Sequence, residues 1–170
     1  MRRAYLSFPV LALIFISNTS FYVNPDYYLV IDKSDYNLYV FDEDGWLLTF
    51  PVVFGSKDQS DKMMEGDRKT PEGSFRIVNK RVHEKWCRFL LIDYPNPESR
   101  QKFNERKAKG LIPQSARIGG SIGIHGTWPR EDFAIDRFQN WTQGCISMKN
   151  SDVIKLYGMI HSGTRVIIQK

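Results

Sequence analysis

The sequence has little cysteine and little net charge, and each scarcity excludes a class of protein. Its 170 residues contain two cysteines, Cys87 and Cys145, so at most one disulfide can form. Basic residues outnumber acidic ones by only 24 to 19. Nucleic-acid-binding domains usually carry a dense basic stripe. A surplus this small does not indicate one, and we expect no nucleic acid partner.

Repeats and low-complexity runs are also absent, which excludes a repeat architecture and a disordered chain. The sequence is 42% hydrophobic and 25% charged, as in an ordinary globular protein. A chain of 170 residues supports one domain around one core. We therefore look for one active site.

The apolar run near the N-terminus is too short to span a bilayer, which takes about 20 apolar residues. Arg2 and Arg3 precede this run, which ends at Ile16 and is followed by small polar residues. That order is typical of a secretory signal. We predict that residues 1–20 are a signal peptide or N-terminal anchor, that residues 21–170 form the folded domain, and that the protein is exported to the periplasm or cell envelope. No Ala-x-Ala cleavage site is present, so this segment can remain uncleaved. It would then anchor the protein to a membrane, and we expect no other membrane attachment.

Short β-branched and aromatic runs dominate the rest of the chain. Residues 27–32 and 37–41 flank a polar turn and predict a hairpin, and a turn ending at Gly45 leads to a third strand at 46–53. Further strands are expected at 74–78, 89–92, 122–125 and 164–169, and helices at 98–109 and 151–159. The pattern predicts a mainly β fold, a sandwich or open barrel with one or two short helices.

Residues 55–70 are polar, lack periodicity and form a connection longer than packing requires. Long loops on rigid sheets often line functional sites, so we expect this one near the site. Cys87 lies in the aromatic stretch Trp86-Cys87-Arg88-Phe89, which predicts a place in the core.

The segment around Cys145 has the residues that a nucleophile needs. A thiol attacks as the thiolate, and a neighbouring histidine can take its proton and favour the ion pair. His125 lies 20 residues upstream, far enough for the chain to leave a strand and return. Gly144 permits a sharp turn that aims backbone N–H groups at a tetrahedral oxyanion. The carbonyl of Gly126 is a candidate acceptor for the second imidazole nitrogen.

His125 and Cys145 can also be unrelated to each other, one a strand histidine with its bonds satisfied and the other a buried thiol. Together with His161 they can instead be zinc ligands, although closely spaced ligand pairs are absent. Caspase-like chemistry requires a histidine about 50 residues before the cysteine, which does not fit.

The segment resembles the L,D-transpeptidases of the YkuD type. Their signature is a histidine followed after 14 to 17 residues by Ser or Thr, then His-Gly-Cys, and the matching residues here are His125, Thr142, Gly144 and Cys145. The stretch "YYLVIDKSDYNLYVFDEDG" resembles the first hairpin of that family, and "GDRKTPEGSF" its Thr-Pro-x-Gly loop. "LLIDYPN" resembles a segment of its murein-acting, YafK-like branch.

The resemblance implies a β-sandwich catalytic domain over residues 21–170 that acts on peptidoglycan stem peptides. In the family, the cysteine attacks a tetrapeptide stem, releases the terminal D-alanine, and passes the acyl group to an amine or to water. This makes Cys145 the nucleophile and His125 the base, with N–H groups of Gln143, Gly144 and Cys145 as oxyanion donors. The oxyanion and substrate-binding set is completed by Gly126, Thr127, Thr142 and Ser147. No cofactor and no metal are implied, and we expect a monomer.

Two positions depart from the family pattern. Gln143 replaces the usual second histidine, and Ser147 stands where Arg or Asn is common, which removes a partner for a substrate carboxylate. Both departures concern the acceptor. The alternatives are therefore an L,D-carboxypeptidase, an amidase-type murein hydrolase that detaches a protein from murein, or an inactive wall-binding module.

Overall fold

The computed structural model describes residues 26–170, and the predicted signal peptide or anchor at 1–20 lies outside them. In these residues no helix is long and apolar enough to cross a membrane. The strands are β1 (Tyr28–Asp32), β2 (Asn37–Asp42), β3 (Gly45–Val53), β4 (Gly73–His83), β5 (Cys87–Ile92), β6 (Gly123–His125), β7 (Ile146–Met148) and β8 (Arg165–Gln169). The helices are α1 (Pro97–Ala108), α2 (Phe133–Asp136) and α3 (Asn150–Met159).

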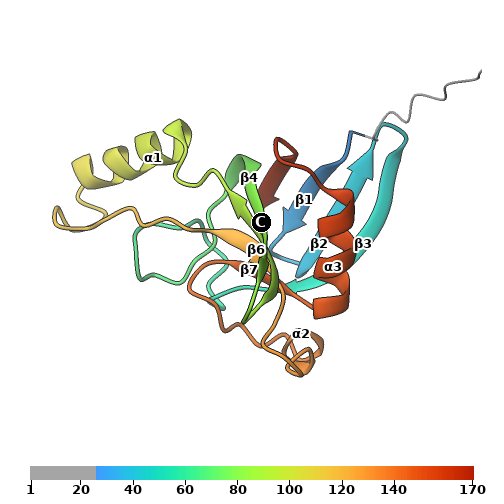
Figure 1. The fold of residues 1–170 in the computed structure, drawn as a ribbon. Helices are drawn as coiled ribbons and strands as arrows, with labels where there is room; N and C mark the ends of the chain where they lie inside the picture. The colour runs from blue at the N-terminus through green and yellow to red at the C-terminus, as the bar shows by residue number, and fades with distance from the viewer. Residues whose placement is uncertain (1–25) are drawn as a thin grey trace, which may run out of the picture.

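The strands form two sheets that share β3 and β4, so the strand order β1-β2-β3-β7-β6-β5-β4-β8 closes into a barrel (Figure 1). The first half of β4 pairs with β8 and the second half with β5. The register shifts between Ile77 and Asn79, where β4 passes from one sheet to the other. The mainly β prediction is confirmed, and long shared strands explain why the two sheets close instead of remaining a separate sandwich.

The predicted first hairpin is confirmed, with β1 and β2 antiparallel and Leu29 opposite Val40. Gly45 has φ +123°, a conformation that favours glycine, and it ends the turn before β3. The structure has three helices in its described part where the sequence predicted one or two. The additional helix, α2, is four residues long, too short to show a helical period.

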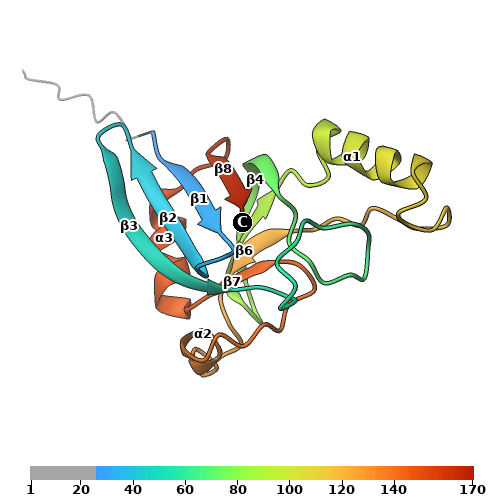
Figure 2. The ribbon, with the colours of Figure 1, turned by 180° about the vertical axis from the view of Figure 1, so that it is seen from behind.

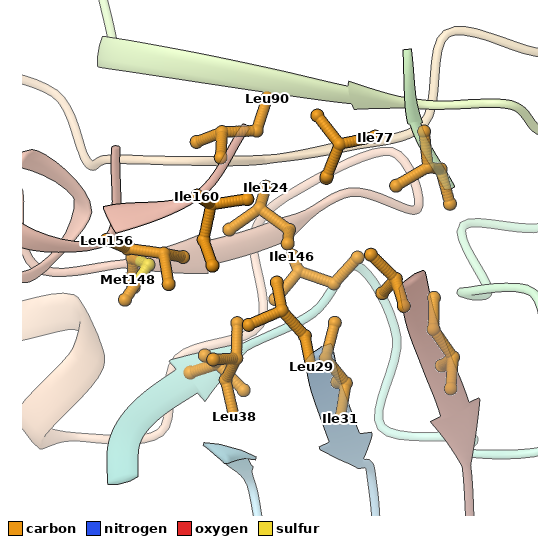
Figure 3. Close-up of a cluster of buried hydrophobic side chains, with 14 of the residues drawn as sticks. Leu29, Ile31, Leu38, Ile77, Leu90, Ile124, Ile146, Met148, Leu156 and Ile160 are labelled. Atoms are coloured by element: carbon orange, nitrogen blue, oxygen red, sulfur yellow. The ribbon is translucent and has the colours of Figure 1, made fainter. Parts of the chain in front are cut away.

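The core lies inside the barrel, where both sheets and α3 contribute apolar side chains (Figure 3). Leu29 and Ile31 of β1 alternate with outward residues and are fully buried. Ile124 and Ile146, on neighbouring strands, point to the same interior. α3 covers β5 and β6 and adds Val153 and Leu156 to this cluster.

Helix α1 lies at the edge of the molecule, on the side away from α3 in both views (Figures 1 and 2). Asn96 caps its start by accepting a hydrogen bond from the N–H of Ser99, and Pro97 occupies the first turn, where its missing N–H is not needed. Phe103 is its buried residue. Arg106 connects the helix to the 55–70 loop through an ion pair with Asp61.

Candidate active site

Two neighbouring parallel strands carry the predicted histidine and cysteine. Ile124 of β6 pairs with Ile146 of β7, and His125 pairs with Ser147. Side chains alternate along a strand, so the two isoleucines fill the core while His125 points to the outer face. Cys145 comes directly before β7 and two residues before Ser147, which places it on the same outer face as His125.

A cavity of about 770 Å³ lies on this outer face of the sheet. The predicted site residues that line it are Cys145, His125, Thr142 and Gln143. The remaining predicted residues, Gly126, Thr127, Gly144 and Ser147, are outside its wall. The structure therefore brings the proposed nucleophile and base to one cavity and places the second group behind them.

Cys145 is partly covered, and its thiol lies 3.5 Å from the carbonyl oxygen of Ser121. Ser121 has φ +57°, a left-handed conformation that is uncommon outside glycine and is concentrated at functional sites. Burial raises the pKa of the Cys145 thiol, because the thiolate loses hydration. A hydrogen bond with the backbone of Gly123 and the charge of Lys62 act in the opposite direction.

His125 is enclosed by aromatic rings and only 2% exposed. The Trp86 ring stacks on its imidazole at a centroid distance of 4.7 Å, and Trp141 meets it edge-on at 5.5 Å. This burial lowers the pKa of His125 to about 4, although the bond to Gly126 favours the charged form. Nδ1 lies 2.7 Å from the carbonyl oxygen of Gly126, the acceptor suggested by the sequence. Because a carbonyl only accepts, Nδ1 carries the hydrogen and Nε2 is left to take a proton.

The directions of these two pKa shifts run against one expectation. The sequence suggested a thiolate–imidazolium ion pair, but a raised thiol pKa and a lowered imidazole pKa both favour neutral groups at pH 7. The reason is desolvation by the aromatic wall, which disfavours either charge. With both groups neutral, the thiol proton must leave as Sγ attacks. No hydrogen bond joins Cys145 to His125 in this structure, where the thiol contacts the carbonyl of Ser121 instead.

The turn before Cys145 is held by Thr142. Its hydroxyl donates to the carbonyl of Cys145 at 2.8 Å and accepts from the N–H of Gly144 at 3.1 Å. Gly144 has φ +122°, and a Cβ there would lie 2.7 Å from the carbonyl oxygen of Lys69. The N–H of Gly144 is therefore committed inside the turn, whereas that of Gln143 donates to no group within residues 26–170.

The long loop at 55–70 lies against the back of this turn, near the site as expected, although none of its residues lines the cavity. Thr70 donates its hydroxyl to the carbonyl of Gly144 at 3.0 Å, and Arg68 reaches the carbonyl of Thr142 at 3.4 Å. Gly55 approaches so closely that a Cβ would lie 2.5 Å from the Thr142 carbonyl oxygen. The loop supports the nucleophile turn from the rear.

Buried charges fix that loop, and the sequence did not predict them. Lys33 follows β1 and is fully buried, with its ammonium 2.8 Å from a Glu72 carboxylate oxygen. Lys62 is paired with Asp67 at 2.8 Å. Each buried ammonium is paired with a carboxylate, and this pairing offsets the free-energy cost of removing the charge from water. The partners Lys33 and Glu72 lie far apart in the chain, so no local pattern reveals the pair.

Thr127 and Ser147 are buried behind His125, away from the cavity. The Thr127 hydroxyl donates to Asp132 at 2.5 Å and accepts from the Asn150 amide at 2.9 Å. The Ser147 hydroxyl lies 3.4 Å from the carbonyl oxygen of Gly126, which also binds His125. These residues hold the histidine segment and do not face a ligand in this geometry.

Several cavity residues are not predicted by the sequence. The aromatic wall consists of Trp86, Phe89, Trp128 and Trp141. The composition of the 86–89 stretch predicts core, but Phe89 pairs with His125 and shares its outer face. Cys87 is half-buried and packs against the edge of the core. The strand register, which the sequence does not show, is what brings these rings to the cavity.

Neither cysteine forms a disulfide, and residues 26–170 contain no cluster of His, Cys, Asp and Glu side chains suited to a metal ion. His161, the third residue of the zinc alternative, contacts the hydroxyl of Thr164 through Nδ1 at 2.7 Å.

Known proteins share this arrangement of strands. The model of the YkuD family, described as the L,D-transpeptidase catalytic domain, matches residues 26–168. No curated protein sequence matches the chain. Among solved structures, the helical cell shape determining protein Pgp2 from Campylobacter jejuni is 25% identical, with a TM-score of 0.62 over 88% of this chain and 49% of its own.

Two further solved structures share the fold. Bd1075 from Bdellovibrio bacteriovorus is 21% identical, with a TM-score of 0.58 over 85% of this chain and 48% of its own. An L,D-transpeptidase from Mycobacterium smegmatis is 18% identical, with a TM-score of 0.52 over 86% and 59%. The chain thus spans about half the length of the solved structures that it matches, and at identities below 25% the likeness concerns the fold alone.

Proposed function

Because the chain belongs to the YkuD family of L,D-transpeptidase catalytic domains, we propose that it transfers acyl groups of peptidoglycan stem peptides through a thioester at Cys145. The observation that carries this proposal is the shared cavity of Cys145 and His125, which lie on one outer face of adjacent parallel strands. The bond from His125 to Gly126 supports it further, since it leaves Nε2 available as the base.

The proposed reaction begins with neutral groups. Sγ of Cys145 bonds to the carbonyl carbon of the stem while Nε2 of His125 takes the thiol proton. Backbone N–H groups of Gln143 and Cys145 stabilise the oxyanion, because the N–H of Gly144 is bound to Thr142. The bond to the terminal D-alanine then breaks, and His125 returns the proton to the leaving nitrogen. An amine or water attacks the thioester, with His125 again as base.

The acceptor is the finer part of the proposal. We propose the murein-acting, YafK-like branch, in which transfer to an amine is the first candidate and hydrolysis the second. Gln143 is exposed at the cavity wall, so an amide replaces the usual imidazole beside the nucleophile. Ser147 is buried, and its hydroxyl lies close to the carbonyl oxygen of Gly126. The serine at this position therefore leaves no buried hydroxyl without a hydrogen-bond partner.

Incubation of the protein with purified muropeptides, and separately with murein that still carries linked protein, followed by mass spectrometry, separates these reactions. A transpeptidase produces cross-linked dimers, a carboxypeptidase releases D-alanine alone, and an amidase-type hydrolase frees a murein-linked protein. We expect dimers, and Cys145→Ala is the control. The absence of every product would favour an inactive wall-binding module.

We also propose that residues 1–20 direct export to the periplasm or cell envelope and that the domain acts as a monomer. A fusion of residues 1–25 to a reporter that folds only outside the cytoplasm tests the first point. Retention of that reporter in the cytoplasm would contradict it.

A further inference from the structure

The wall of the Cys145 cavity contains one permanently charged side chain, Arg81. The other lining residues are uncharged or aromatic, and burial keeps His125 neutral at pH 7. No Asp or Glu lines this cavity. Within residues 26–170, Arg81 takes part in no ion pair, and it is exposed at the cavity. The cavity is therefore positive and carries no acid of its own.

The strand register places this charge beside the reacting groups. Arg81 of β4 pairs with Phe89 of β5, which pairs with His125 of β6, so the three side chains form one row on the outer face. The guanidinium lies 5.2 Å from the centre of the Phe89 ring, which is 5.9 Å from the centre of the His125 ring. The row thus runs from the cation across an aromatic surface to the base.

The distances limit which part of a ligand this cation can reach. Neighbouring strands are about 4.8 Å apart, so the Cα atoms of Arg81 and His125, two strands apart, are separated by about 10 Å. One extended residue spans about 3.5 Å. Cys145 precedes β7, one strand beyond β6, so its Cα atom lies about 14 Å or more from that of Arg81. Because the Arg81 side chain extends over the Phe89 ring, a group that meets its guanidinium lies within about two to three residues of the carbonyl attacked by Cys145.

We propose that Arg81 binds a carboxylate of the substrate and makes the site specific for stem peptides that keep this group free. The inference rests on the proposed function for the identity of the ligand as a stem peptide. The carboxylate is either that of the terminal residue or that of the side chain of the neighbouring diamino acid. Arginine suits both, because its planar fork matches a carboxylate with two parallel hydrogen bonds.

The surroundings of Arg81 strengthen this assignment. The guanidinium lies over the Phe89 ring, which gives it an aromatic surface on one side while it stays open to a ligand on the other. On the same hairpin, Glu84 and Lys85 carry opposite charges, and both line an adjoining cavity that Arg81 shares, not that of Cys145. Ser147, buried and uncharged, cannot supply the carboxylate partner that the family commonly has there.

Equilibrium binding in a Cys145→Ala background tests the proposal without any chemical step. Three synthetic tetrapeptide stems are compared by calorimetry: one with free carboxylates, one with a terminal carboxamide, and one with the diamino acid side chain amidated. We expect one of the two amides to bind about tenfold or more weakly than the free stem, as for loss of a hydrogen bond to a charged group. Which amide is weaker identifies the source of the carboxylate.

Adding Arg81→Gln should weaken the free stem to the level of that amide and leave the amide itself unchanged, so the discrimination disappears. Arg81→Lys should retain part of it, since lysine keeps the charge but not the fork. Lys85→Gln is the matched control, because it removes a charge from the same hairpin outside the Cys145 cavity, and it should keep the full discrimination.

Three results would overturn the role of Arg81: equal weakening of all stems by Arg81→Gln, unchanged discrimination, or failure of every stem to bind. Failure of the proposed function gives a different result, namely no thioester on the wild-type protein although the free stem binds and discriminates. The two failures are therefore separable.

Discussion

The pH dependence of Cys145 acylation follows from the buried imidazole. His125 acts as a base only when neutral, and its pKa of about 4 keeps it neutral down to mildly acidic pH. Acylation should therefore be flat from about pH 5 to pH 8 and fall about tenfold per pH unit below 4. An ordinary histidine, with a pKa of 6.5, would already be half-protonated at pH 6.5.

The size of the His125 pKa shift results from the enclosure of the imidazole by aromatic rings. A pKa lowered from 6.5 to about 4 corresponds to about 3 kcal/mol against the imidazolium. Trp86 contributes through its stacked ring, so Trp86→Leu should admit water and move the acid limb upward by about one pH unit. Trp128→Leu is the matched control, because Trp128 lines the same cavity and makes a ring contact with Trp86, not with His125.

The assay is single-turnover acylation by a tetrapeptide stem, quenched in acid and read by intact-protein mass spectrometry from pH 3 to pH 8. The folded fraction must be followed by circular dichroism at each pH. Unfolded His125 binds a proton below 6.5 and folded His125 only near 4, so the free energy of unfolding declines by up to about 3 kcal/mol as the pH falls through that window. An acid limb near 6.5 in the folded wild type would refute the reasoning.

Alkylation of Cys145 by iodoacetamide, which reacts with the thiolate, should still be rising at pH 9, because the thiol pKa is raised; a plateau from pH 5 to pH 8 would instead indicate an ion pair. Gln143→Ala should change kcat little, whereas Gln143→Pro should lower it about 10²–10³-fold by removing an oxyanion N–H, and equal loss in both would show that the side chain is what matters. Gly144→Ala should lose both activity and thermal stability, because the new Cβ meets the Lys69 carbonyl at φ +122°, and a melting temperature equal to wild type would contradict this. Thr127→Val should lower the free energy of unfolding by about 1–3 kcal/mol, measured in urea, because it removes one donor to Asp132 and leaves the Asn150 side-chain amide without its acceptor.

Local patterns were sufficient for much of the fold. Alternating strands, the Gly45 turn and the helix predicted at 98–109 each depend on residues close in sequence, and the structure has all three. β7 and α2 were missed because three or four residues show no period. Yet β7 places Cys145 beside the strand of His125, so the missing element is one that assembles the site.

The candidate site, like the fold, was predictable from the sequence only in part. Cys145 and His125 are visible in the sequence because their chemistry and spacing are distinctive. Burial of the pair was not visible, since it depends on Trp86 and Trp141, which come from separate segments. Arg81 was not visible either, because only the pairing of β4 with β5 and β6 brings its row to His125.

The most direct test of the account is the mass of the protein after mixing with a tetrapeptide stem. We predict that wild-type protein gains the mass of the stem less that of the free D-alanine released, and that peptide mapping places this adduct on Cys145. Cys87→Ser should form the same adduct, since Cys87 does not line the cavity, and Cys145→Ala should form none. A wild-type protein that turns over stems without this adduct, or a Cys145→Ala variant that remains active, would contradict the assignment of Cys145 as the nucleophile.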